Sequence, residues 1–296
     1  MALLIGSANM DERYSPILAP NLFYGDWLSP GVTYNDNYQT DNAGRIYLHK
    51  LTTSLGVPST PGSDYTDEKY ADTLIQATFN NEFNASKKIY GSQAAQVAFP
   101  AAEENLRVVT QQVRENMNQS ALACLLTEGT TSATTTAITA ANVKSLILAE
   151  RTAASKSKVR PGIVLCSPEV YSAILEAAGT QYVPDINNRI NDSGAVGHWL
   201  GMTFIECNGL AEATSKATYY DFSGTKKEIA TTALPLTDFI MYDKEFFSVL
   251  PSVTNYRIID SERFFGSLAQ ATVLVGYRVF EAGAVRIKKH AAPTGG

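Results

Sequence analysis

Cysteine and histidine are the residue types in this 296-residue chain that could supply a nucleophile and its base. Cys166 and His198 lie in the same half of the chain, and a thiol beside an imidazole could form such a pair. However, Cys166 ends an apolar run that predicts a buried strand, and His198 stands in a glycine-rich stretch that predicts a turn. We therefore interpret Cys166 as a core residue and expect no catalysis at this pair.

The other titratable residues form no stronger pattern. Asp260 and Glu262 are expected on a strand and at its exit, where two carboxylates are more commonly solvated or ion-paired than hydrolytic. His49 falls in a predicted hairpin and His290 in the C-terminal tail, so neither has a candidate partner nearby in the sequence. These residues predict no acid–base site.

Sequence motifs for cofactors and metals are missing. The chain contains no GxGxxG after a predicted strand, no Walker A loop, no GxSxG and no HExxH. Its three cysteines are far apart and show no CxxC spacing, so neither a disulfide framework nor a zinc knuckle is encoded. We therefore predict that the protein is not an enzyme, with no catalytic, cofactor-binding or metal-binding residues and no cofactor.

The composition excludes several classes of partner. A formal net charge of −5 argues against a nucleic-acid reader with a basic surface and against a binder of anionic membranes. No apolar run approaches the ~20 residues of a membrane-spanning helix. Widely spaced cysteines are typical of a reducing cytoplasm. Charged residues make up 18% of the chain, against ~25% in an average soluble domain, which indicates that partners cover part of the surface.

The first third of the chain does not predict a self-contained core. Residues 1–30 are interrupted by prolines yet carry large apolar side chains, so this arm must pack on another part of the chain or on a neighbour. Alternating patterns at 45–51 and 73–79 predict two strands joined by a turn-rich connector, 52–72. An isolated two-stranded hairpin is marginally stable in water, so we expect outside contacts to steady this one. The alternative is a ligand-binding flap on a conventional domain.

One long helix is predicted in the middle of the chain. Pro100 followed by two glutamates favours its start, and Gly129 favours its end. Apolar residues recur every three or four positions, which predicts a rod of ~28 residues covered on one flank only. The threonine-rich residues 127–139 predict a solvated link between subdomains, and a second amphipathic helix is predicted over 142–154.

The second half predicts a mixed α/β unit. Residues 162–166 form a short apolar strand pattern, and Ser167-Pro168-Glu169 is typical of a capped helix start. Further strands are predicted at 202–206, 217–221, 238–242, 256–260, 270–280 and 284–289.

Four stretches of this half carry a resemblance to a known family. Residues 160–175, RPGIVLCSPEVYSAIL, are similar to a family pattern of a strand followed by a Ser-Pro helix. Residues 197–210, GHWLGMTFIECNGL, are similar to its glycine-flanked strand that leads into a loop. Residues 238–249 resemble its next strand and short helix, and 264–279, with VGYRV near the end, resemble its final strands. In this order and spacing, the chain resembles the major capsid protein of tailed bacteriophages, whose fold encapsulin nanocompartments share.

The resemblance implies an α+β fold, the phage major-capsid fold, with five parts. These are an N-terminal arm at 1–30, an extended β-hairpin loop at 31–99, a spine helix of the peripheral domain at 100–137, a mixed α/β axial domain at 138–251 and the C-terminal strands of the peripheral domain at 252–296. The unsupported arm, the hairpin with little core and the low charge all follow if much of the surface is subunit interface.

The implied function is structural. The resemblance implies a protein that self-assembles into hexamers and pentamers, which form the icosahedral head around the viral double-stranded DNA without binding that DNA specifically. It implies assembly in the host bacterial cytoplasm, localisation to the virion, no contact with a membrane, and a portal, a separate scaffolding protein and a decoration protein as further partners. An encapsulin-type compartment shell is the alternative. A soluble α/β enzyme is a third hypothesis, but it requires a convergent polar site that the sequence does not reveal.

The chain also departs from some relatives. No charged extension precedes the arm, so we expect a separate scaffolding protein and an arm that is not cleaved away. Some relatives crosslink a lysine of the extended loop to an asparagine. Lys50, Lys69, Lys87 and Lys88 are available here, but nothing in the sequence marks one of them as reactive.

Overall fold

The computed structural model describes residues 27–35, 45–51, 61, 72–91, 101–178, 183–184, 196–210, 218–229 and 236–291. Its α-helices are α2 (Ala101–Glu128), α3 (Val143–Lys156) and α4 (Pro168–Ala178), and its short 3₁₀ helices are η2 (Asn208–Leu210), η3 (Lys244–Phe246) and η4 (Ala282–Ala284). The strands are β1 (Arg45–Leu51), β2 (Asp72–Thr78), β3 (Asn81–Tyr90), β4 (Thr130–Thr131), β5 (Ile163–Cys166), β6 (Val183–Pro184), β7 (Val196–Trp199), β8 (Met202–Glu206), β9 (Thr218–Tyr220), β10 (Lys226–Glu228), β11 (Thr237–Tyr242), β12 (Phe247–Asp260), β13 (Gly266–Val279) and β14 (Val285–Lys289).

The chain divides into two compact units. Unit 1 contains the described residues of 83–117 and 253–273, and unit 2 contains those of 25–82, 118–252 and 274–296. The long elements α2, β3, β12 and β13 therefore contribute residues to both units. Residues 1–26 of the predicted arm and most of the predicted connector 52–72 lie outside the described residues.

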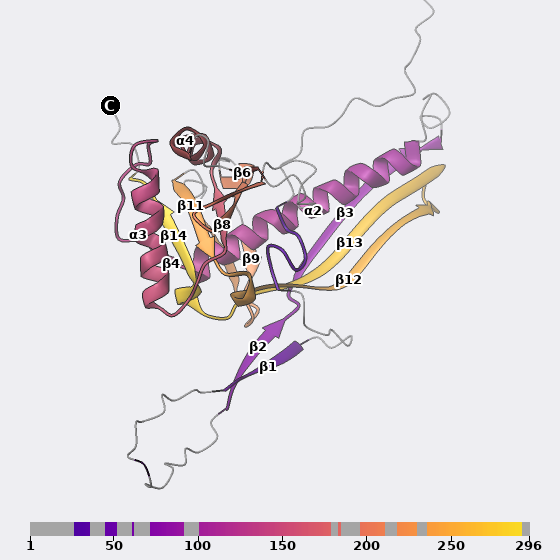
Figure 1. Cartoon of the computed structure of the whole chain (residues 1–296). Coiled ribbons are helices and arrows are strands. Elements are labelled where there is room, and N and C mark those ends of the chain that lie inside the picture. Colours follow the sequence, from indigo (N-terminus) through magenta and orange to yellow (C-terminus); the bar gives the residue numbers. More distant parts are fainter. Residues whose placement is uncertain are drawn as a thin grey trace, which may run out of the picture. The chain divides into compact units, whose positions relative to one another are not determined.

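Unit 2 is built on a seven-stranded sheet with the order β4-β14-β11-β5-β8-β7-β6. β5 runs parallel to β8 and antiparallel to β11, and all the residues of β5 and β11 are buried. Alternate side chains of these strands, such as Cys166 and Met241, pack against Ile147 of α3 and Ile174 of α4. Figure 1 shows both helices beside this sheet. The sheet face below α3 and α4 is therefore the main core.

The opposite face of the sheet receives the C-terminal part of α2. Ile287 lies opposite Ile240 in the β14–β11 ladder, and a Cβ added to Gly129, at the end of α2, would touch the Ile287 side chain. The end of α2 at Gly129 is as predicted, but the one-sided stripe is wrong for residues 120–126, which are all buried. Their sequence, SALACLL, is small or apolar on every side of the helix, which allows protein to surround it.

The remaining strands form three smaller sheets. β12, β13 and β3 make a three-stranded sheet with β13 in the middle, while β1 pairs with β2 and β9 with β10. β12 begins at Phe247, well before the strand predicted at 256–260, because the segment after η3 is extended from its first residue. The other strands predicted for the second half, and the helix start at Ser167, are confirmed: the Val170 N–H lies 3.4 Å from the Ser167 hydroxyl oxygen.

The threonine-rich stretch 127–139 is only in part the solvated link that its composition predicts: residues 133–137 are exposed, but the residues before them join the sheet. Thr130 and Thr131 form β4, which pairs parallel with Arg286 and Ile287 of β14, and Ser132 is buried. The stretch extends the sheet because β14 offers it a free edge, and the sequence of the stretch itself does not show this. No helix among the described residues is both long enough and apolar enough to cross a membrane.

Candidate functional site

The structure does not bring Cys166 and His198 together. Cys166 pairs with Glu206 and His198 with Thr203, so strand β8 lies between the two residues and they are three ladder positions apart. Burial raises the pKa of the Cys166 thiol well above its usual value, so the reactive thiolate is strongly disfavoured. The interpretation of Cys166 as a core residue is confirmed.

His198 is exposed on strand β7, not in the turn that we predicted. The glycines around His198 suggest a turn two residues too early. The turn is formed by Leu200 and Gly201, with φ of 53° and 74°. Two consecutive positive φ values suit a tight hairpin between β7 and β8. The Leu200 carbonyl accepts a hydrogen bond of 2.6 Å from Arg151 of α3, which fixes the turn.

The sequence did not reveal a carboxylate–imidazole pair. His290 Nδ1 lies 2.7 Å from Asp238 Oδ1, which joins the end of β14 to a β-bulge in β11. Burial raises the pKa of Asp238, and the hydrogen bond from His290 partly offsets this. In the described part of the chain no hydroxyl or thiol hydrogen-bonds to the His290 ring, and no group of side chains is arranged to hold a metal ion. The His290–Asp238 pair therefore links the end of β14 to β11.

The predicted hairpin is present as a two-stranded sheet. β1 and β2 pair antiparallel in an unbroken ladder from Arg45 opposite Thr78 to Leu51 opposite Asp72. Within the described residues no third strand joins them. A two-stranded sheet of this kind has two open edges and needs support from elsewhere, which makes it a candidate contact element.

Residues 27–35 form a docked strap before the hairpin. Trp27, at 2% exposure, stacks on Phe247 with ring centroids 6.4 Å apart. Lys244 and Glu245 of η3 hold the strap from outside: the Lys244 ammonium donates to the Gly31 carbonyl at 2.8 Å, and the Asn35 amide donates to the Glu245 carboxylate at 3.0 Å. The end of the predicted arm is thus bound to its own unit.

Unit 1 presents an exposed aromatic turn between β12 and β13. Phe265 is 88% exposed, whereas neighbouring Phe264 lies 5.0 Å from Tyr90 between ring centroids and has the Lys88 ammonium 5.9 Å from its ring. A pocket of about 380 Å³ lies beside Phe264. Asp260 and Glu262 both line this pocket, at the end of β12 and just after it, as the sequence predicts. An aromatic ring this exposed is typical of a contact surface.

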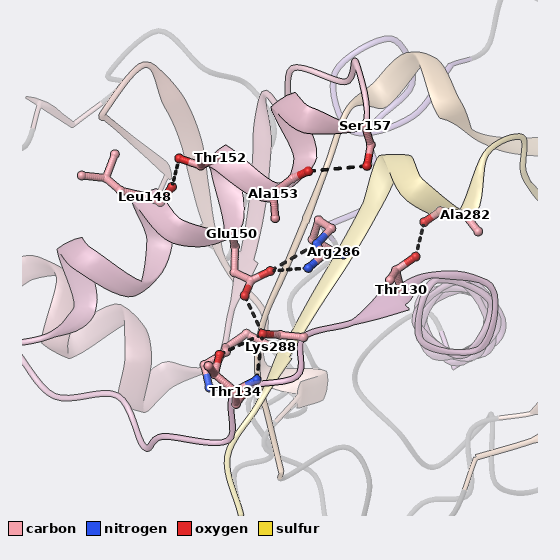
Figure 2. A network of polar contacts seen from close by, with 11 residues as sticks. Thr130, Thr134, Leu148, Glu150, Thr152, Ala153, Ser157, Ala282, Arg286 and Lys288 are labelled. Carbon is pink, nitrogen blue, oxygen red and sulfur yellow. Dashed lines mark hydrogen bonds and ion pairs between the residues drawn. The ribbon is translucent and has the colours of Figure 1, made fainter.

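A buried ion pair joins α3 to β14. Figure 2 shows Glu150 of α3 pointing toward Arg286 of β14, whose guanidinium donates to Glu150 Oε2 at 3.0 and 3.2 Å. Ser132 donates a third hydrogen bond to Oε1 at 2.5 Å. Both charged side chains are largely buried, at 8% and 17% exposure, so the pair is shielded from water.

Lys288 lies beside this ion pair and is fully buried. Its ammonium donates to the carbonyls of Thr134 at 2.7 Å, Thr136 at 3.0 Å and Lys289 at 3.2 Å. Burial lowers the pKa of Lys288, and the negative charges of Asp238 and Glu150 partly offset this. These contacts tie the threonine-rich stretch to β14 and stabilise the edge of the sheet.

Comparison with known proteins finds matches among solved structures. No protein-family model and no curated protein sequence matches the chain. The chain is similar to a structure from Mycobacterium phage Che8, with a TM-score of 0.67, 14% identity, and 95% of this chain and 97% of that one covered. It is similar to the capsid structure of the cyanophage P-SCSP1u, with a TM-score of 0.68, 9% identity, and 96% and 94% covered. It is also similar to the capsid of Ralstonia phage GP4, with a TM-score of 0.61, 8% identity, and both chains covered in full.

The chain has the fold of the phage capsid structures that it matches. This confirms the α+β fold class predicted from the sequence, including the extended hairpin and the long helix. At 8–14% identity these capsid structures share the fold with this chain but little of the sequence, so the resemblance lies in the order of the elements and not in any one motif.

Proposed function

We propose that the chain is the major capsid protein of a tailed bacteriophage. Copies of it assemble into hexamers and pentamers and form the icosahedral head that encloses the viral double-stranded DNA. The observation that carries this proposal is the similarity to phage capsid structures over nearly the whole length of both chains. The role is structural, and we propose no catalytic activity for the chain.

Surface features of the single chain support an assembling protein. The β1–β2 hairpin is two-stranded, and unit 1 exposes Phe265 as well as Tyr256 and Ile258 of β12. Contact with other subunits would cover these groups, and removing apolar surface from water drives association. Low charge is consistent with the same role, because the buried centre of an interface is depleted of charged residues.

We propose the same division of the chain that the resemblance implies. Residues 31–99 are the extended loop, 100–137 and 252–296 belong to the peripheral domain, and 138–251 are the axial domain that meets its copies at the capsomer axes. Strand β14 lies in the range 252–296, yet it pairs with β11 of the range 138–251. The C-terminal strand thus connects the two proposed domains through the sheet.

Further copies of the chain are the main partners in this proposal. A portal, a scaffolding protein and a decoration protein complete the particle, which is assembled in the host cytoplasm. The head contains the DNA without binding it specifically, which agrees with the net charge of −5 of the chain.

The decisive experiment is electron microscopy of the purified full-length protein, expressed alone and together with neighbouring genes of its source genome. We expect closed shells built from fivefold and sixfold capsomers. A protein that stays monomeric at high concentration under all these conditions would contradict the proposal. Shells that hold enzyme cargo in place of a genome would instead identify an encapsulin-type compartment.

A further inference from the structure

The root of the β1–β2 hairpin is fixed by a dense set of contacts within unit 2. The chain leaves β2 at Thr78 and enters β3 at Asn81. Ala77, Phe79 and Leu250 form a small buried cluster at this point, with 1%, 8% and 2% exposure. A Cβ added to Gly276 would lie 2.6 Å from the Thr78 carbonyl oxygen, so β13 approaches the root more closely than a side chain would permit.

Polar side chains at the root bind the turn that follows β9. The Thr78 hydroxyl donates to the Phe222 carbonyl at 2.8 Å. The Asn80 amide donates to the same Thr78 oxygen at 2.7 Å and to the Asp221 carbonyl at 2.8 Å. Thr78 therefore both donates and accepts, and Asn80 closes a ring of hydrogen bonds between the root and the turn.

Asn81 continues the contact one residue further. Its side-chain amide donates to the Tyr220 carbonyl at 3.0 Å, and its side-chain oxygen accepts from the Tyr220 N–H at 2.7 Å. Asn81 is 3% exposed, so both bonds are shielded from water. This two-point contact sets one register between the root and β9.

The turn that receives the root is itself held in shape. The Asp221 carboxylate accepts hydrogen bonds from the Ser223 N–H at 2.9 Å, the Ser223 hydroxyl at 2.6 Å and the Thr225 N–H at 2.9 Å. The Arg278 guanidinium lies 4.1 Å from the centre of the Phe222 ring. The turn is thus a rigid support and not a loop that adapts to the hairpin.

We propose that Thr78, Asn80 and Asn81 are positioning residues that set the direction in which the β1–β2 hairpin leaves unit 2. Among the described residues no third strand joins the hairpin, and the root contacts are what holds its direction there. This inference rests on the proposed capsid function, in which the extended loop must meet a neighbouring subunit at a defined angle. A free hinge at the root would leave the hairpin folded but wrongly aimed.

The test measures the direction of the hairpin in the unassembled, full-length subunit. Spin labels on cysteines introduced at His49 of β1 and at the exposed Lys144 of α3 report the distance between the hairpin and its own unit by double electron–electron resonance. The native Cys124, Cys166 and Cys207 are buried, so the labels react with the introduced positions. We expect a single narrow distance distribution.

The informative variant is Asn80→Asp, which keeps the shape of the side chain but removes its donor and places a carboxylate against the Asp221 carbonyl. We expect the width of the distance distribution to at least double, while the midpoint of thermal unfolding changes by only a few degrees. Asn116→Asp, at an exposed position on α2 with the same charge change, is the control and should leave the width unaltered. An unaltered width in Asn80→Asp would overturn the proposal.

A second variant covers the case in which Asn80→Asp does not fold. Thr78→Val has the same shape and suits a strand, and it removes only the hydroxyl that bridges Asn80 and Phe222. We expect it to broaden the distribution as well, with Thr131→Val, at an exposed position of strand β4, as its control. A folded Thr78→Val subunit with the original narrow distribution would overturn the proposal as well.

Assembly of the same variants separates this inference from the proposed function. We expect the wild type and both controls to form shells, and Asn80→Asp and Thr78→Val to form few or misshapen ones. Normal shells from a variant with a broadened distribution would show that the hairpin direction does not matter. If the wild type forms no shells, the proposed function is wrong, while the distance measurements still decide whether these residues orient the hairpin.

Discussion

The ion pair between Glu150 and Arg286 gives a quantitative test of what holds unit 2 together. Replacing Glu150 with Met leaves the Arg286 guanidinium at 17% exposure without the carboxylate that accepts both of its hydrogen bonds. Breaking a buried pair on one side costs about 3–5 kcal/mol, because a desolvated charge remains without a partner. Arg286→Met leaves the Glu150 carboxylate with the Ser132 hydroxyl as a donor but without a counter-charge from Arg286. Each single variant should therefore lose unfolding free energy in this range.

The double variant separates the ion pair from general packing. With both residues replaced by Met neither charge of the pair remains. Replacing a buried ion pair by apolar residues is commonly neutral, or stabilising by about 1–4 kcal/mol. The Ser132 hydroxyl keeps Thr134 as a partner, with 2.9 Å between the two hydroxyl oxygens. We therefore expect Glu150→Met/Arg286→Met to be more stable than either single variant. Such non-additivity is the signature of a direct pairwise interaction.

Urea denaturation followed by tryptophan fluorescence is the appropriate assay. The chain has two tryptophans, Trp27 and Trp199, and both are buried in unit 2, so the signal reports this unit. Urea is uncharged and does not screen the pair. Glu176→Ala, at an exposed position of α4, is the control and should change the free energy of unfolding by less than ~0.5 kcal/mol. Single variants that lose under ~1 kcal/mol, or a double variant that loses the sum of both, would refute this account of the pair.

Three further predictions follow from other parts of the chain. Replacing residues 52–71 with a short Gly/Ser linker should change the unfolding free energy of the subunit by only ~1 kcal/mol, because loop-closure entropy varies slowly with length. The same replacement should abolish shells in electron microscopy, and normal shells would contradict the role of the extended loop. Val113→Asp buries a charge at 0% exposure in α2, so circular dichroism should show an unfolded or grossly destabilised subunit; a wild-type melting curve would show that the helix is not packed there. Burial raises the pKa of Glu128 above 4.5, so the folded state binds this proton more tightly than the unfolded state, and stability falls as the pH rises from 4.5 through the raised pKa. The Glu128→Gln variant should lack this loss, so urea titrations should show it gaining stability relative to the wild type between pH 4.5 and 7. A stability difference that stays constant across that range would refute the assignment.

Local signals in the sequence were sufficient for several elements of the fold. The hairpin was predictable because apolar and polar residues alternate in both strands and a turn-rich connector separates them. The β1–β2 ladder, which begins with Arg45 opposite Thr78, confirms it. The ends of α2 were predictable because glutamates and a glycine mark the two ends of a helix chemically. These signals act within a few residues, so no knowledge of the fold is needed to read them.

Residues whose role depends on distant partners were not predictable. In β14 the alternation of Val285 and Ile287 places Lys288 on the other face of the strand, where a lysine is expected to reach solvent. The structure buries it because the threonine-rich stretch, about 150 residues earlier in the sequence, offers the Thr134 and Thr136 carbonyls. Asn80 and Asn81 look like ordinary turn residues for the same reason, since the sequence does not show their partners near β9.

The burial of residues 120–126 differs from these cases because its signal was present in the sequence. No side of this segment carries a charged or large polar residue, which is the pattern of a helix surrounded by protein. Before residue 120 the charged residues Arg107, Arg114 and Glu115 give α2 a polar side, and a single pattern for the whole helix does not show the change. Reading the two halves separately would have predicted that α2 passes from a partly covered segment to a fully buried one.

The outer part of β12 links the low charge of the chain to its proposed assembly. Residues 254–258 are all exposed, although strands usually bury alternate side chains, and Tyr256 and Ile258 each keep 39% of their surface in contact with solvent. β12 is also an edge of its three-stranded sheet, where unpaired backbone groups invite contact with another chain. A protein that worked as a monomer would be expected to protect such an edge with prolines or several lysines, and residues 254–258, TNYRI, carry one arginine alone. Among the described residues this edge is left open, which is tolerable when assembly covers it. This favours a surface shaped for contact with other copies over one shaped for solvent.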